Sequence, residues 1–195
     1  MEYAIKHKTL YESFFRQKNI FLDISMMLIA VVFLGILSNL YIPLWPVPIT
    51  GQTLGIFLIA FWFGSRKGLV TLGLYTLAGI IGFSVFTQHK SGIAAITGPT
   101  GGYILGFLAA VFVVGYLIEK GYGRTKTSVL YCMILGNAII YIIGLIGLKL
   151  YLVDVGLLKL LTLGLFPFLI GDAVKIVAAV ALFPYLWKGS EKIEY

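Results

Sequence analysis

Long apolar stretches dominate the chain and are separated by short polar segments. A membrane-spanning helix needs about 20 mainly apolar residues, because only a helix or a closed barrel satisfies backbone polar groups inside lipid. The run Ile134–Gly147 is apolar on every face, whereas the strands of a membrane β-barrel alternate apolar and polar residues. The pattern therefore predicts an all-α integral membrane protein.

The apolar stretches predict six spanning helices. We place them at Phe21–Tyr41, Thr53–Gly64, Gly68–Phe86, Gly102–Glu119, Ser128–Leu150 and Gly164–Trp187. Residues 20–188 would then form a six-helix transmembrane domain, followed by a cytoplasmic tail at 189–195. The second stretch covers only about 18 Å at about 1.5 Å per residue, so we expect it to be tilted, extended through Gly51 and Gln52, or packed within the protein.

Lysines and arginines are distributed unevenly about these helices. With both termini inside, 11 of the 15 fall on the cytoplasmic side, and the opposite side receives Lys90, Lys149 and Lys159. The positive-inside rule therefore predicts that both termini lie in the cytoplasm. Residues 1–19 carry no apolar region with a small-residue cleavage site, so we expect a retained cytoplasmic segment, with an interfacial helix as one form of it.

Composition supports this class of protein and argues against several others. Hydrophobic residues make up 59% of the chain and charged residues 12%, whereas soluble domains carry about a quarter charged residues. The net charge of +7 does not indicate nucleic-acid binding, because membrane-length segments separate the basic residues. A lone cysteine, Cys132, builds neither a disulfide framework nor a thiolate metal site. Walker and hydrolase motifs are absent, so we expect no enzyme, metal site or cofactor.

Asp172 and Lys175 are the strongest candidate site residues. Their spacing places both on one face of the last predicted helix. Each charge at the bilayer centre costs about 2.5–3.5 kcal/mol, so charged residues within a spanning helix usually have a functional role. A polar substrate site is the main interpretation. An ion pair that only stabilises the bundle and an acid–base pair of a membrane-embedded enzyme are the alternatives.

Two further segments carry candidate ligand contacts. Gly98–Tyr103 is rich in glycine and enters the fourth predicted helix, where backbone N–H groups attract anions and glycines permit close approach. We select Gly98, Thr100 and Tyr103 there. Pro46–Thr53 brings Gln52 and Thr53 to the start of the second helix, where ordinary helix capping is the alternative.

The outer connections Pro43–Pro48 and Thr87–Gly101 are longer than the cytoplasmic turns, which predicts a ligand lid on the outer side. Lys90 lies in the second connection. It is a candidate cation for a carboxylate-bearing ligand, or else a solvated loop charge.

Three motifs resemble the BioY family in their order and in their placement on the helices: Pro46–Leu54, Gly98–Tyr103 and Gly171–Lys175. The resemblance extends from about Asp23 to Trp187. It implies a six-helix S component of an energy-coupling-factor (ECF) transporter that captures biotin with high affinity near the outer surface and has no ATPase activity of its own. A transmembrane coupling protein and two cytoplasmic ATPases would supply the energy. An S component for another vitamin and a solitary biotin transporter are the alternatives.

The resemblance also implies roles for single residues. Asp172 would accept ureido N–H groups of biotin beside Lys175, and Lys90 would approach the carboxylate, although the two lysines could exchange roles. Gln52, Thr53 and Tyr103 would complete the lining. Such proteins present a small-xxx-small patch on the first helix to the coupling protein, and Ala30 and Gly35 are the candidates here, although Met26 and Leu34 replace the expected small neighbours of Ala30.

Overall fold

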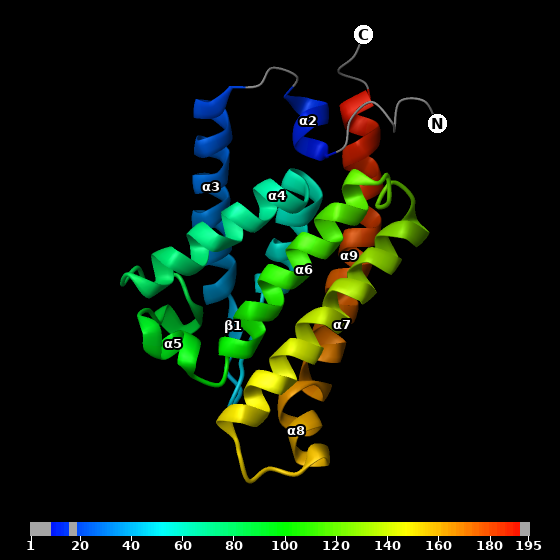
Figure 1. The fold of residues 1–195 in the computed structure, drawn as a ribbon. Coiled ribbons are helices and arrows are strands. Elements are labelled where there is room, and N and C mark those ends of the chain that lie inside the picture. The colour runs from blue at the N-terminus through cyan, green and yellow to red at the C-terminus, as the bar shows by residue number, and fades with distance from the viewer. Residues whose placement is uncertain (1–8, 16–18, 192–195) are drawn as a thin grey trace.

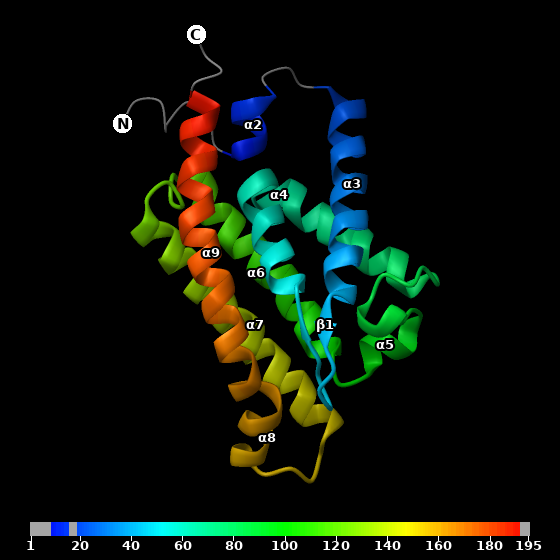
Figure 2. The same cartoon turned by 180° about the vertical axis from the view of Figure 1, so that it is seen from behind.

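The computed structural model describes residues 9–15 and 19–191, which form a bundle of long helices with a small hairpin at one end (Figures 1 and 2). The long helices are α3 (Ile20–Asn39), α4 (Gln52–Ile80), α6 (Gly101–Glu119), α7 (Lys126–Tyr151) and α9 (Phe166–Glu191). The shorter elements are α2 (Leu10–Phe14), β1 (Tyr41–Ile42), β2 (Ile49–Thr50), η1 (Thr87–His89), α5 (Ile93–Thr97) and α8 (Leu157–Gly164).

Helix α6 is central to the packing. It has extensive interfaces with α4 and α7, while α3 packs mainly on α4 and α9 mainly on α7. The short helix α2 and the last turns of α9 lie at one end of the bundle (Figure 1). The β1–β2 hairpin, α5 and α8 lie toward the opposite end, and the two views agree on this arrangement. The loops that carry candidate site residues are therefore remote from α2.

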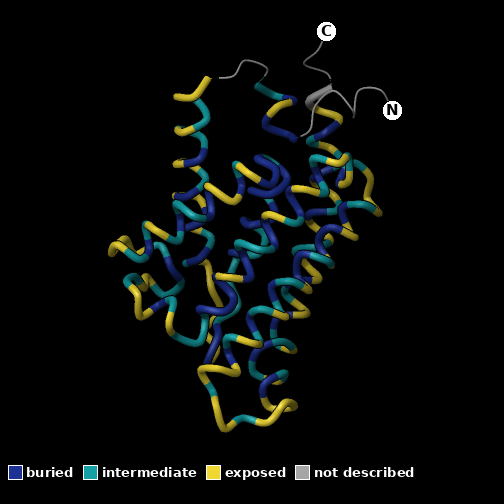
Figure 3. Tube along the Cα trace, in the orientation of Figure 1, coloured by how far each residue is buried: buried dark blue, intermediate teal, exposed yellow. Residues whose placement is uncertain are grey.

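Exposed residues occur along all the long helices (Figure 3), and many of them are large and apolar. On α3, Phe21 is 78% exposed and Val32 62% exposed, which suits contact with lipid better than contact with water. Within the described residues, five helical segments are long and apolar enough to cross a membrane: Ile20–Asn39, Gln52–Ile80, Gly101–Glu119, Lys126–Tyr151 and Leu157–Gly189. The helical, membrane-protein class predicted from the sequence is confirmed.

The helices expected at Thr53–Gly64 and Gly68–Phe86 lie within the single element α4. Gly64 has φ 75° and ψ −161°, a conformation outside the helical region that divides α4 into two segments at a kink. The Glu119 carboxylate accepts hydrogen bonds from Ser65 N at 2.7 Å and from Ser65 Oγ at 2.8 Å, just after the kink. The count of six spanning segments stays a prediction, because it requires that the two halves of α4 each cross the membrane.

Other expected boundaries also move, and one connection lies between paired strands. Helix α4 ends at Ile80 instead of Phe86, and the outer connection that follows contains η1 and the helix α5. Gly164 ends α8 instead of beginning the last span, which starts at Phe166 with Pro167 in its first turn, where proline's missing N–H is tolerated. The connection Pro43–Pro48 lies between the paired strands β1 and β2.

Part of the predicted N-terminal segment is packed into the bundle. Helix α2 buries Leu10 and Tyr11, which are 1% and 3% exposed, and it contacts α4 and α9. Lys67 Nζ lies 4.4 Å from the Tyr11 ring centroid and 2.8 Å from Asp23 Oδ2. Burial and the neighbouring Asp23 carboxylate raise the pKa of Tyr11 to about 12, so Lys67 meets a neutral ring at neutral pH. Residues 1–8, 16–18 and 192–195 of the predicted terminal segments lie outside the described residues.

Glycines bring the backbones of α6 and α7 close together. A Cβ atom added to Gly102 would lie 2.8 Å from Gly147 Cα, and one added to Gly106 would lie 3.0 Å from Ile140 Cα. Small residues at such crossings allow the backbone contact on which helix association in lipid depends. The crossing places the outer parts of α6 and α7 side by side, and both contribute to the site described below.

The two residues expected to dock a partner differ in exposure. Ala30 on α3 is half-buried, whereas Gly35 is buried and faces Val85, whose Cβ would lie 3.5 Å from a Cβ added to the glycine. One helical turn further, Ser38 donates a hydrogen bond to Val85 O at 2.5 Å. The chain's own loop therefore covers the side of α3 at Gly35, and the docking role of Gly35 stays a prediction.

Candidate ligand-binding site

A cavity of about 170 Å³ lies among α4, α6, α7 and α9, the β1–β2 hairpin and the loop around α5. All eight site residues selected from the sequence line it: Gln52, Thr53, Lys90, Gly98, Thr100, Tyr103, Asp172 and Lys175. Trp45 also lines the cavity and is 72% exposed, so the cavity reaches the surface beside the hairpin. The structure thus brings together residues that the sequence distributes over more than 120 positions.

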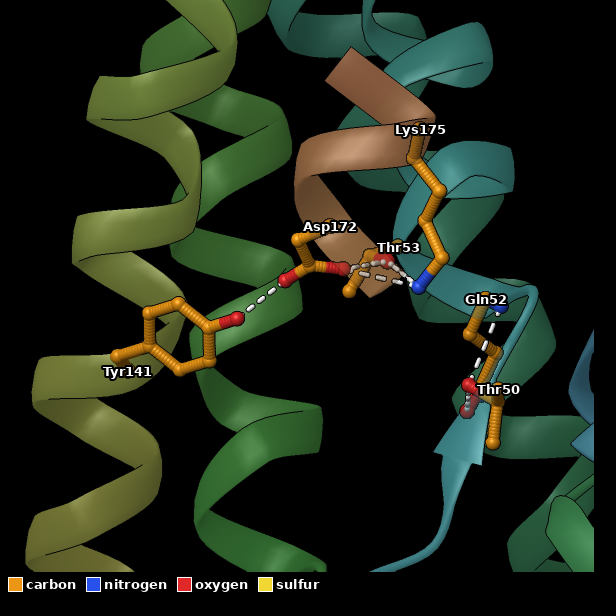
Figure 4. Close-up of polar contacts among 6 residues, drawn as sticks. All are labelled: Thr50, Gln52, Thr53, Tyr141, Asp172 and Lys175. Atoms are coloured by element: carbon orange, nitrogen blue, oxygen red, sulfur yellow. Dashed lines mark hydrogen bonds and ion pairs between the residues drawn. The ribbon is translucent and has the colours of Figure 1, made fainter. Parts of the chain in front are cut away.

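Asp172 and Lys175 form an ion pair in the cavity wall, with 2.9 Å between Lys175 Nζ and Asp172 Oδ1 (Figure 4). Their side chains are 17% exposed for Lys175 and 7% for Asp172. Thr53 of α4 joins the pair, because its hydroxyl accepts from Lys175 Nζ at 2.7 Å and donates to Asp172 Oδ1 at 3.1 Å. Tyr141 of α7 donates its hydroxyl hydrogen bond to Asp172 Oδ2. Three helices therefore meet at one carboxylate.

Nothing in the sequence pattern distinguishes Tyr141 from Tyr131 and Tyr151, the other two tyrosines of α7. A buried tyrosine hydroxyl usually finds a hydrogen-bond partner, and this general rule is the only available signal. Phe168 is a second unpredicted wall residue. Its ring centroid lies 6.4 Å from that of Tyr141 and 6.2 Å from that of Tyr103, so aromatic surface flanks the ion pair.

Gln52 is engaged by the protein itself. Its Nε2 donates to Tyr75 Oη at 2.8 Å, and its Oε1 accepts from Thr50 at 3.3 Å and from Thr87 at 3.2 Å. Thr50 also accepts from Gln52 N at 3.2 Å, although the N-cap residue of α4, Gly51, has no side-chain cap hydrogen bond. Gln52 thereby connects the start of α4 with the outer loop and holds that wall of the cavity in place.

The segment Gly98–Tyr103 turns into α6 against the preceding helix α5. A Cβ added to Gly101 would lie 1.7 Å from Ile96 O, so only glycine fits this approach. Thr100 directs its hydroxyl to Ala95 O at 3.2 Å. The Tyr103 hydroxyl donates a hydrogen bond to Gly164 O at 2.6 Å. Tyr103 therefore contributes its ring to the cavity lining, instead of its hydroxyl.

Lys90 is exposed and lies in the cavity lining beyond η1. Among the described residues its ammonium group makes no ion pair, whereas Lys175 is paired deep in the wall. The cavity therefore offers a buried, paired lysine at one place and an exposed lysine at another. That arrangement suits a ligand with one polar group on its body and a second on an extended arm.

The chain is similar to known proteins over most of its length. The model of the BioY family matches residues 11–192. A biotin transporter BioY of Thermotoga maritima is 37% identical over 144 residues, covering 72% of this chain and 81% of the relative. A probable biotin transporter BioY of Pyrococcus horikoshii is 32% identical over 160 residues, covering 82% of this chain and 93% of the relative.

A solved structure of similar fold supports the same grouping. It is the crystal structure of an S-component for biotin from an ECF-type ABC transporter, which matches with a TM-score of 0.76 at 26% identity. The match covers 85% of this chain and 90% of that one. The family model spans nearly all of the described residues, and the fold agrees with it. This chain belongs to the BioY family.

Proposed function

We propose that this chain captures biotin with high affinity for uptake across the membrane, as the substrate-specific S component of an ECF-type ABC transporter, and that it hydrolyses no ATP itself. The observation that carries the proposal is the Asp172–Lys175 pair, held by Thr53 and Tyr141 in the wall of an aromatic-lined cavity. Family membership indicates biotin as the ligand of this site, because the relatives that match are named as biotin transporters.

The hydrogen-bonding capacity of the wall fits a cyclic urea. An ammonium group carries three N–H donors. Lys175 uses one on Thr53 and one on Asp172, so the third is free to donate to a ureido carbonyl. The rings of Tyr103 and Phe168 supply apolar surface for the bicyclic body of biotin. A ligand that pairs its urea with this wall replaces the water that would otherwise solvate the buried ion pair.

The exposed Lys90 then meets the carboxylate at the end of the flexible biotin tail. Lys175 is already paired with Asp172, whereas Lys90 has no ion-pair partner among the described residues. Neutralising a carboxylate with an unpaired cation costs no existing ion pair. We therefore assign Lys175 to the ureido end and Lys90 to the carboxylate end, which selects one of the two lysine assignments that the sequence leaves open.

The membrane arrangement follows from charge and from the kink in α4. We propose six spanning segments, with α4 counted as two across Gly64, and both termini in the cytoplasm of a bacterial cell. The β1–β2 hairpin and α5, which help to line the cavity, lie toward the end of the bundle opposite α2 (Figure 1), so the cavity would then open to the outer side. The exposed apolar face of α3 near Ala30 would contact the coupling protein, and two ATPases would act from the cytoplasm.

Isothermal titration of biotin into the purified protein tests the site. The variants Asp172→Asn and Lys175→Met each remove a charged hydrogen-bonding partner, worth about 1.5–3 kcal/mol, so we expect affinity to fall about tenfold to 100-fold. Asp154→Asn and Lys159→Met are matched controls, because both residues are exposed and neither lines the cavity. Unchanged affinity in both site variants would contradict the proposal.

Two further measurements address the alternatives that the sequence leaves open. Thermal-shift measurements with a panel of vitamins should show stabilisation by biotin and none by the others. Uptake into proteoliposomes should require the coupling protein, the ATPases and ATP. Biotin uptake by the isolated chain would instead identify a solitary transporter.

A further inference from the structure

The Asp172 carboxylate has little hydrogen-bonding capacity left for a ligand. A carboxylate offers about four lone-pair positions, two on each oxygen. Oδ1 accepts from Thr53 at 3.1 Å and from Lys175 at 2.9 Å, which fills both of its positions. Oδ2 accepts from Tyr141, and this is its single donor among the described residues. One position on Oδ2 is therefore open.

Tyr141 determines where that open position lies. It is the contribution of α7 to the network, whereas Thr53 comes from α4 and Lys175 from the same helix as the carboxylate. Figure 4 shows the Tyr141 hydroxyl approaching Asp172 from the side opposite Lys175 and Thr53. With donors on both sides, rotation of the carboxylate would break at least one hydrogen bond. The orientation of the open position is fixed before a ligand enters.

We infer that Tyr141 is a positioning residue for ligand recognition, and that it fixes which of the two N–H groups of the bound ureido ring Asp172 accepts. This inference rests on the proposed function, because it takes biotin as the ligand. The two N–H bonds of a cyclic urea point away from each other on either side of the carbonyl, so one carboxylate accepts only one of them. Without Tyr141, Oδ2 would have two open positions and the carboxylate would be free to turn. With Tyr141 in place, the two N–H groups of biotin are not equivalent, and only one of them depends on Asp172.

Two cyclic carbamate analogues of biotin test this inequality. In each analogue a ring oxygen replaces one of the two ureido N–H groups, so the bicycle, the carbonyl and the tail keep their shape. Tyr141→Phe removes the hydroxyl and keeps the ring. We expect this variant to bind biotin about tenfold more weakly, because Asp172 is no longer held in the orientation that accepts the ligand. Titration calorimetry on wild type and variant with all three ligands gives the coupling between the hydroxyl and each N–H.

The expected result is asymmetric. One analogue should bind wild type and Tyr141→Phe within about twofold of each other, because it lacks the N–H that Asp172 accepts. The other should lose affinity in the variant by the same factor as biotin. Equal losses for all three ligands would mean that Tyr141 only supports the fold, and a loss of coupling with both analogues would mean that the hydroxyl does not select one N–H group; either result overturns the inference.

Tyr103→Phe is the matched control. It makes the same chemical change in the same cavity, but its hydroxyl bonds to Gly164 O instead of Asp172. Any change in affinity should be the same for biotin and both analogues. If wild type binds no biotin at all, the proposed function fails, whereas normal biotin binding with symmetric analogue effects refutes only the role of Tyr141.

Discussion

Gly64 permits the kink in α4, and its replacement by alanine should destabilise the protein. The conformation at φ 75° and ψ −161° is essentially restricted to glycine, and a side chain there costs about 1–3 kcal/mol. A Cβ atom would also lie 2.5 Å from Glu119 Oε1 and 2.8 Å from Thr9 Cγ2. The new methyl group therefore meets atoms on two neighbouring elements in addition to its backbone strain.

The contact between the new methyl group and Glu119 increases the expected loss of stability. Both hydrogen bonds from Ser65, one from its N–H and one from its hydroxyl, end on the oxygen that the methyl group would displace. A hydrogen bond to a charged group contributes about 1.5–3 kcal/mol. Backbone strain together with the loss of one such bond gives a destabilisation of about 3–6 kcal/mol.

Gly73→Ala is the matched control for this prediction. Gly73 lies in the second segment of α4, and no atom comes within 4 Å of a Cβ added there. Alanine in a helix interior is favoured over glycine by up to about 1 kcal/mol, so this variant should be as stable as wild type or more stable. Unfolding followed by circular dichroism in detergent micelles compares the two. If the unfolding midpoint of Gly64→Ala equals that of Gly73→Ala, the structural account of the kink is wrong.

Three more variants test the site and the packing. Thr53→Val should weaken biotin binding about tenfold in calorimetry, because it removes both hydroxyl contacts of the ion pair, whereas Thr76→Val, whose hydroxyl bonds to a backbone carbonyl, should not. Gly102→Ala should lower the free energy of unfolding by about 1–3 kcal/mol, because its Cβ would lie 2.8 Å from a Cα of α7; a wild-type unfolding midpoint would contradict this. Lys90→Gln should weaken biotin binding about two- to fivefold at low salt and little at high salt, since exposed charges are screened, and Lys159→Gln should have no effect; a loss independent of salt would argue against a role for the exposed charge.

The membrane class and the position of most helices follow from the sequence alone. Hydropathy over about 20 residues reports directly on the cost of placing a segment in lipid, so α3, α6 and α7 fall close to their expected ranges. The candidate site residues could also be selected from local sequence patterns. Charges in an apolar helix and a glycine-rich entry to a helix are unusual wherever they pack, and all eight selected residues line one cavity.

Boundaries that depend on backbone conformation were harder to predict from sequence. Whether Gly64 ends a helix or bends it depends on its contact with Glu119 and on the Ser65 hydrogen bonds, which join segments 54 residues apart. Gly35 illustrates the same limit. A glycine on a helix is suited to close contact with a partner helix, but here Val85, in a loop of the same chain, packs against Gly35.

The role of each polar group in the site was decided by tertiary structure. Thr53 and Asp172 are 119 residues apart, and Tyr141 lies on a third helix, so no local pattern relates them. The sequence identified the residue types that lipid would not tolerate without a function or a partner. Only the packing of α4, α7 and α9 determined which donors reach the carboxylate, because a hydrogen bond requires distances and directions that residue spacing along separate helices does not specify.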